Sequence, residues 1–497
     1  MTTLILLSLL QGFLLALLYY GLAAVLGRAT TPLAGSVGAF SGFALVGFIA
    51  FWTAWVAPDH IGLATSLDWV LIALALVAAW RMPWNREAAV AATLWLVGGV
   101  ALCLWAFAPT GLEDMAAVAR TRWTHPLPGD NVIPLDFAVG LIDGAVPSPL
   151  HAGWLSSDRP PLQTGLFLAL RVSGGFVPLE ASYQVFASVL QMAILPAVYV
   201  LLRALKASTV AAILGAVGVF FAPLTIINGT FVWPKLIAAA FLLAAAALHF
   251  TDLYGEVRSK ALWGGTLGAL CAGAMLCHGG SAFAILAFAL VALVSGRWSS
   301  WRYAITATLA ALALYGPWIG YQHFVDPPGD RLLKWHFAGA EDLADPRSLG
   351  EAVRDAYGPL SAADIADRVM TKAGNSLGHP GAAYSLASDE AARHRAFFNP
   401  IPAMGVMGLP AVAALLVGLF TPLRLLAGTV LVAWALWVVV IWNPIGVVVH
   451  QSTLYLWVGA LVVLIALFRR WPVVLAAIIA LQAGATVVLY AAPPSLS

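Results

Sequence analysis

The chain has 497 residues, of which 61% are hydrophobic and 10% are charged, and its formal net charge is +2 at pH 7. This composition, with a mean hydropathy of +0.90, is typical of a polytopic membrane protein and excludes nucleic-acid binding, which needs a concentrated basic surface. The sequence has no phosphate-binding glycine loop, no H-E-x-x-H and no paired C-x-x-C, so the chemistries that depend on those motifs are excluded as well.

Apolar runs of nearly membrane-spanning length follow one another along the chain and predict an all-α, polytopic transmembrane fold. The first run lacks the basic start and the cleavage site of a signal peptide, so we expect it to remain as a helix. Segment 162–177 is expected to lie on the membrane surface. Fourteen spans are predicted, at 4–26, 33–57, 67–81, 88–108, 181–205, 209–226, 231–250, 262–277, 280–296, 302–322, 402–421, 424–442, 448–468 and 473–491.

Charges in the connecting loops predict the orientation. If the polar loop 109–161 faces outward, the inner loops hold twelve Lys and Arg against three Asp and Glu. Basic loops stay on the cytoplasmic side, so both termini and the large loops are expected outside. The sequence therefore predicts a multi-pass protein of a bacterial inner membrane, in contact with membrane lipids, with its site on the outer, periplasmic side.

The spans and loops divide the chain into four parts. Within the second large loop, 348–357 and 362–373 have helical spacing and predict short helices there. The parts are the N-terminal extra spans 1–87, the module 88–322 with its first outer loop 109–161, the second outer loop 323–401, and the C-terminal spans 402–497.

The first outer loop concentrates acidic residues in a chain that has few charges. Gly129-Asp130-Asn131 reads as a turn before a short helix, with Pro134 in the first turn and Gly144 just past the end. Asp130 would then lie at the helix start, where backbone N–H groups favour a carboxylate. The alternative is that these acids are ordinary helix-start and surface charges. The loop carries Glu113, Asp114, Asp130, Asp136, Asp143 and Asp158.

Several basic residues are candidates for binding a phosphate. Arg159, beside Pro160-Pro161, stands on a stiff backbone that suits a group aimed at an anion, although it could instead reach toward lipid headgroups. Lys235 follows Trp233-Pro234 at the outer start of a span, a pattern that also serves as an interfacial anchor. His278 lies in a tight outer turn, where it could touch phosphate or acceptor, although a turn histidine without a role is the more common finding. The second loop adds a basic and aromatic cluster of Arg331, Lys334, Trp335 and His336, which could also meet anionic headgroups.

An Asp in the first large outer loop, a short helix with Leu and Gly, and then Asp158-Arg159-Pro160-Pro161-Leu162 together resemble the GT-C superfamily of integral-membrane glycosyltransferases. The resemblance covers 88–491 and is closest in arrangement to the protein O-mannosyltransferases and aminoarabinose transferases. Two departures stand out. Glu113-Asp114 occupies the place after the first helix of the module where the family has a tight acidic pair, whereas Asp130 better fits the turn-and-helix context. Residues 1–87 also have no counterpart in the simplest members.

The resemblance implies transfer of a sugar from a polyprenyl-phosphate donor to an acceptor hydroxyl of a glycan, lipid or protein, with inversion at the anomeric carbon. A carboxylate would take the acceptor proton, and cations would stabilise the departing phosphate. Asp130 is the first candidate for the base and Glu113 or Asp114 the rival, while Asp158 would orient the acceptor or, with Asp130, hold Mg²⁺ or Mn²⁺. The phosphate-binding candidates are Arg159, Lys235, Arg331, Lys334 and His278.

Two other functions fit the same architecture. An oligosaccharide polymerase or ligase would use a polyprenyl-diphosphate donor at the same loops. A lipid or glycan transporter would use the acidic loop as a gate, although the scarcity of charge inside the spans argues against ion coupling.

Overall fold

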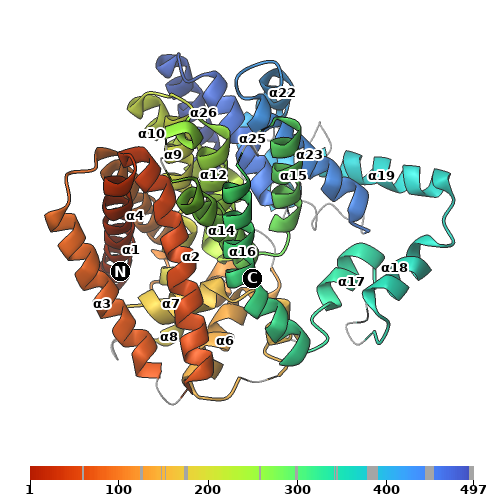
Figure 1. Cartoon of the computed structure of the whole chain (residues 1–497), viewed down its shortest axis with the longest axis horizontal. Helices are drawn as coiled ribbons and strands as arrows, with labels where there is room; N and C mark the ends of the chain where they lie inside the picture. The colour runs from red at the N-terminus through yellow and green to blue at the C-terminus, as the bar shows by residue number, and fades with distance from the viewer. Residues whose placement is uncertain are drawn as a thin grey trace.

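The computed structural model describes most of the chain, and the regular structure of the described residues is helical (Figure 1). Apolar side chains of the helices pack against one another in a bundle. The described residues are 1–58, 61–123, 127–146, 148–151, 153–172, 177–256, 259–296, 300–340, 342, 345–377, 390–442 and 453–491.

Four helices open the chain: α1 (Thr2–Ala29), α2 (Pro32–Val56), α3 (Ile61–Arg81) and α4 (Arg86–Phe107). The Thr31 hydroxyl accepts the N–H of Ala34 and so caps α2, whose first residue is a proline. Asn85 caps α4 in the same way through its side-chain oxygen. Helices α2 and α4 therefore begin directly after their capping residues, within two residues of the predicted starts.

The predicted first outer loop, 109–161, contains α5 (Met115–Thr121), the 3₁₀ turn η2 (Gly129–Val132), α6 (Ile133–Ile142) and the 3₁₀ turn η3 (Ser156–Asp158). The predicted turn and short helix are confirmed by η2 and α6. Pro134 lies in the first turn of α6, and Gly144, with φ +73°, lies just past its end in a conformation that glycine adopts without strain.

Helix α7 (Leu162–Leu170) lies inside the bundle, so the prediction of a membrane-surface segment at 162–177 is wrong for its described part. All nine of its residues are buried, and it packs on α2. A Cβ added at Gly165 would lie 2.0 Å from the backbone oxygen of Gly47 on α2. Glycine permits this close approach of two helices, and an apolar run of nine residues next to charged loops does not reveal it.

The centre of the bundle is built from α8 (Leu179–Gln191), α9 (Ile194–Ala204) and α12 (Lys235–Phe250), the last with every residue buried. Between them, α10 (Thr209–Phe220) and α11 (Pro223–Phe231) form a pair bent by 64°. The Phe221 carbonyl left free by this bend accepts hydrogen bonds from Gln482 Nε2 at 3.0 Å and Thr486 Oγ1 at 2.6 Å. A break among apolar helices is tolerated because those side chains satisfy its backbone.

The remaining helices before the predicted second outer loop, 323–401, are α13 (Leu253–Glu256), α14 (Lys260–Cys277), α15 (Ser281–Val294) and α16 (Trp301–Phe324). The loop itself contains α17 (Arg331–Ala338), α18 (Leu349–Tyr357), α19 (Ala362–Leu377) and α20 (Glu390–Phe398). Helices α17, α18 and α19 stand to one side of the bundle (Figure 1). Both helices predicted in this loop are confirmed as α18 and α19.

The chain ends with α21 (Pro400–Ala403), the turn η5 (Gly405–Met407), α22 (Gly408–Gly418), α23 (Arg424–Val440), α25 (Leu454–Leu467) and α26 (Pro472–Tyr490). Every predicted span has a corresponding helix, although the start of the predicted span 448–468 lies outside the described residues. Within the described ranges, seven helices, or eight if the bent pair counts as one span, are long and apolar enough to cross a membrane, and six further apolar helices are shorter. These helices support a polytopic helical membrane protein.

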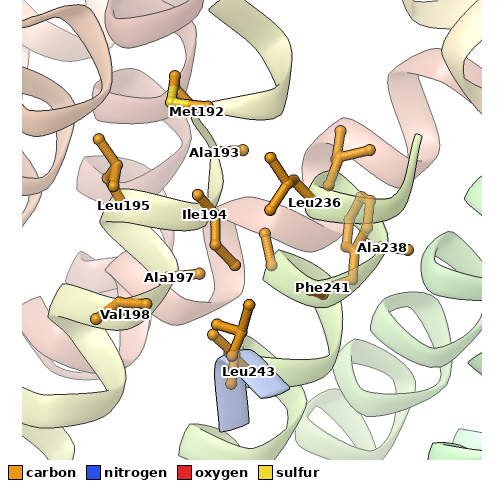
Figure 2. Packing of buried hydrophobic residues seen from close by; sticks show 14 of the residues in the cluster. Met192, Ala193, Ile194, Leu195, Ala197, Val198, Leu236, Ala238, Phe241 and Leu243 are labelled. Carbon is orange, nitrogen blue, oxygen red and sulfur yellow. The ribbon is translucent and has the colours of Figure 1, made fainter. Parts of the chain in front are cut away.

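One large apolar core joins the bundle from α1 to α26. Figure 2 shows side chains of α9 and α12 facing one another within it, among them Ile194, Leu236 and Leu243. Helices α1 and α2 belong to the same core, with α1 against α4 and α8 and α2 against α7, α12 and α14. Residue 87 is therefore not a packing boundary, and the N-terminal helices share the core with the helices that carry the site.

Candidate functional site

Asp130 and Arg159 form a partly buried ion pair. Arg159 Nη2 donates to Asp130 Oδ2 at 2.6 Å, and Trp233 Nε1 donates to Asp130 Oδ1 at 3.0 Å. The Asp130 side chain is 7% exposed. The indole of Trp154 lies 4.5 Å from the Arg159 guanidinium and provides a stacking surface for it. A carboxylate from η2 and a guanidinium from the turn after η3 are thus held together, although 29 residues separate them in sequence.

Lys235 lies beside this pair at the start of α12. Its ammonium stands 3.7 Å from the centre of the Trp233 ring, and its charge interacts with both Asp130 and Arg159. Trp233 therefore contacts Asp130 through its N–H and Lys235 through its face. The side-chain oxygen of Gln191 accepts the N–H groups of residues 236 and 237 at 3.2 Å, which fixes the first turn of α12 and with it the position of Lys235.

Val232, directly before Trp233, has φ +58° and ψ 24°. A β-branched residue rarely adopts this left-handed conformation, and its cost is on the order of 1–3 kcal/mol. The Val232 carbonyl accepts Gln163 Nε2 at 3.0 Å, one of the contacts that hold the strained turn. Strain of this kind concentrates at functional sites, and here it turns the chain from α11 into the Trp233–Lys235 segment.

Two histidines adjoin the same group of charges. Burial lowers the pKa of His278 well below its usual value, and the charges of Lys235 and Arg159 lower it further. Burial, followed by Arg159 and Lys235, lowers the pKa of His336 to about 4. Both imidazoles are therefore neutral near pH 7 and provide hydrogen-bonding groups beside the cations without adding charge.

Asp158 holds the turn that precedes Arg159. Its Oδ2 accepts the Leu155 N–H at 2.8 Å and lies 3.6 Å from Arg331 Nη1. Burial raises the pKa of Asp158, and the Leu155 N–H, Arg331 and Arg159 oppose that rise. Asp158 thus shapes the η3 turn, and Arg331, predicted to bind phosphate, is paired with Asp158.

Other predicted residues lie apart from this group. Glu113 and Asp114 are exposed in the turn before α5, so the structure does not bring the rival acids together with buried Asp130. Lys334 points into the second outer loop, where its ammonium donates to the carbonyls of Asp345 at 2.7 Å and Arg347 at 3.0 Å. That lysine holds the loop between α17 and α18, and its predicted phosphate contact is not supported by this arrangement.

The predicted Mg²⁺ or Mn²⁺ between Asp130 and Asp158 does not fit the donor set. Both oxygens of Asp130 accept hydrogen bonds from Arg159 and Trp233, and Asp158 faces Leu155 N–H and Arg331. A hard divalent cation takes six or more oxygens with carboxylates in excess, whereas these carboxylates are surrounded by cations. Among the described residues, no three His, Cys, Asp or Glu side chains form a group that could hold a metal.

Sequence reasoning missed the contact residues of the site. Trp233 was expected only as an interfacial anchor beside Lys235. Neither Trp154 nor Asp326, whose Oδ2 accepts the Ser156 hydroxyl of η3 at 2.6 Å, drew a prediction. The signal that could have found Trp233 is the W-P-K triplet, which places an indole N–H and a lysine within three residues at a helix start. Asp326 stands after the tenth predicted span without any local pattern.

Comparisons with known proteins give no family: no protein-family model, curated protein or solved structure matches this chain.

Proposed function

We propose that the protein is a GT-C-like membrane glycosyltransferase that moves a sugar from a polyprenyl-phosphate donor to an acceptor hydroxyl. In this proposal the eight longer spans and the six shorter apolar helices all cross the membrane, and the two large loops meet at the outer face of a bacterial inner membrane. The observation that carries the proposal is the buried Asp130 carboxylate held against Arg159, with Lys235 beside it.

The transfer requires one base and one anion-binding group. The acceptor oxygen attacks the anomeric carbon while its proton passes to Asp130, and the bond from that carbon to the phosphate oxygen breaks. Polyprenyl phosphate leaves with the bonding electron pair, and Arg159 and Lys235 stabilise its charge. Each carboxylate oxygen has two lone pairs, so Asp130 retains acceptor sites beyond those used by Arg159 and Trp233.

Charge balance favours a monophosphate over a diphosphate donor. The Arg159 guanidinium is paired with the Asp130 carboxylate, Lys235 supplies at most one further positive charge, and the lowered pKa values of His278 and His336 keep both neutral, so the site has at most one net positive charge. A sugar phosphodiester carries one negative charge and neutralises the site, whereas a diphosphate leaves an excess negative charge near Asp130. A buried charge without a partner costs free energy, so a ligase or polymerase function is less favoured.

The bent pair α10–α11 does not favour a transporter. Broken helices in transporters present free backbone groups to their substrate. Here the Phe221 carbonyl at the bend is already bonded to Gln482 and Thr486. The Phe221 carbonyl at the break is thus hydrogen-bonded within the protein and does not present a free group to a substrate.

Transfer of radiolabelled sugar from a polyprenyl monophosphate, measured in native membranes that supply the acceptor, tests the proposal. Asp130→Asn should abolish turnover while leaving donor binding within about threefold, since the amide keeps the shape but cannot take a proton. The matched control is Asp143→Asn, at an exposed Asp of the same loop, which should retain wild-type turnover. Full activity of Asp130→Asn would refute the assigned base, and absence of any transfer by the wild type would refute the function.

A further inference from the structure

We infer that the segment from Tyr321 to Arg331, termed the strap, positions Arg159 for the donor phosphate by holding the η3 turn. Asp326 is the central positioning residue of the strap. This inference rests on the proposed function, because it assigns the strap's effect to the phosphate-binding step of that same site.

Asp326 bonds to both serines of the turn. Its Oδ2 accepts the Ser156 hydroxyl at 2.6 Å and the Ser157 N–H at 3.1 Å, while its Oδ1 accepts the Ser148 hydroxyl at 3.4 Å. Ser156 and Ser157 are buried. A carboxylate that accepts three hydrogen bonds from two parts of the first outer loop fixes those parts relative to the end of α16, since hydrogen bonds to a charged acceptor are among the stronger ones.

The two ends of the strap add contacts to the same turn. The Tyr321 hydroxyl lies 2.6 Å from Ser156 Oγ, and Gln322 Nε2 donates to the Ser157 carbonyl at 2.9 Å. At the other end, Arg331 Nη2 donates to the Gly153 carbonyl at 3.2 Å and its Nη1 faces Asp158. Both ends of the strap therefore bond to the η3 residues immediately before Arg159.

The N-terminal helices support the strap. The Trp55 ring on α2 packs edge-on against Tyr321 at 4.9 Å, and Trp318 stacks on Tyr321 at the same centroid distance. Phe137 of α6 closes the group at 6.1 Å from Tyr321. This aromatic contact gives 1–87 a role, because α2 packs against the strap and through the strap supports the η3 turn.

The consequence for Arg159 follows from its place in the chain. Arg159 directly follows η3 in an extended conformation, with φ −123°, so the turn sets the direction in which its side chain leaves the backbone. Nothing in the strap contacts the reacting carbon in this account, so Asp326 acts through Arg159. Loss of Asp326 should weaken phosphate binding without removing the base Asp130.

The test measures binding of a polyprenyl monophosphate to the purified full chain in detergent, together with turnover and thermal stability. Asp326→Ala should raise the donor Kd by at least about tenfold, and Asp326→Asn, which keeps one acceptor oxygen, by about threefold. Tyr321→Phe removes one hydroxyl contact and should resemble Asp326→Asn. Asp367→Ala, at an exposed Asp of α19, is the matched control and should leave Kd unchanged.

The readouts separate positioning from folding. If Asp326 were merely structural, its loss would lower the melting temperature and the number of active molecules while the folded fraction kept the wild-type Kd. An unchanged Kd in Asp326→Ala refutes the inference, whether or not stability falls. If the wild type does not bind polyprenyl monophosphate at all, the proposed function fails instead, and the two failures are thus distinguishable.

Discussion

Substitutions of Trp233 distinguish most sharply between the proposed base and the proposed phosphate-binding lysine, because two parts of this side chain contact Asp130 and Lys235. Its N–H donates to Asp130 at 3.0 Å, and its ring faces the Lys235 ammonium at 3.7 Å. Trp233→Phe removes the N–H and keeps an aromatic face. Trp233→Leu removes both. Trp233→Phe should therefore lower kcat alone, whereas Trp233→Leu should lower kcat and also weaken donor binding.

The magnitudes follow from the lost contacts. A hydrogen bond to a charged carboxylate contributes about 2 kcal/mol, so Trp233→Phe should lower kcat about 30-fold by releasing Asp130 from its orientation. The donor Kd should change by no more than about threefold, since a phenyl ring still faces Lys235. Trp233→Leu also loses a partly desolvated cation–π contact of about 1–2 kcal/mol and should raise the donor Kd about tenfold.

The assay is transfer of radiolabelled sugar from polyprenyl monophosphate at saturating donor, with donor binding measured separately. A Trp233→Phe variant with wild-type kcat would contradict the reasoning about Asp130. Equal donor affinities in Trp233→Phe and Trp233→Leu would contradict the reasoning about Lys235.

Three further predictions concern pH and packing. The pKa of His336 is about 4 in the folded protein and about 6.5 in the unfolded chain, so the unfolded chain binds more protons between these pH values. The stability measured by thermal unfolding should therefore fall as the pH drops from about 6.5 toward 4, and it should fall less in His336→Gln. Gly165→Ala should unfold the bundle or lower its melting temperature strongly because its Cβ would strike the Gly47 carbonyl, whereas Gly265→Ala, which meets nothing within 4 Å, should be neutral. Gln191→Leu should destabilise the protein by about 2–4 kcal/mol, since two buried N–H groups of α12 lose their acceptor; a stable variant would show that they find another partner.

The local features of the fold were predictable from the sequence. Pro134 and Gly144 mark the ends of α6, and Ser348 with Glu351 forms the capping box that starts α18. At the next helix, Ser361 and Asp364 bond reciprocally although Asp replaces the preferred Glu. Such features depend on neighbours three or four residues apart, which a single sequence displays.

The site was predictable only in part, because its contacts join distant segments. Asp130, Arg159 and Lys235 were named from loop position and residue type, and the structure brings them together. Lys334 donates to loop carbonyls, and Asp130 accepts from Trp233, which is 103 positions further along the chain. Both contacts result from how the helices pack, and no local sequence pattern indicates them. Whether an acid is buried or exposed, the difference between Asp130 and Glu113, is decided by that same packing.

Native mass measurement of lipid that remains bound to the purified protein tests the central claim most directly. The account predicts a polyprenyl monophosphate or its sugar ester on the wild type and its loss from an Arg159→Met/Lys235→Met variant that retains the wild-type melting temperature within a few degrees. The Arg424→Met/Arg470→Met variant, altered at two cations that the sequence predicts on the inner side, should keep the lipid. A bound lipid that lacks phosphate, or equal retention of the phosphate lipid by all three proteins, would contradict the account.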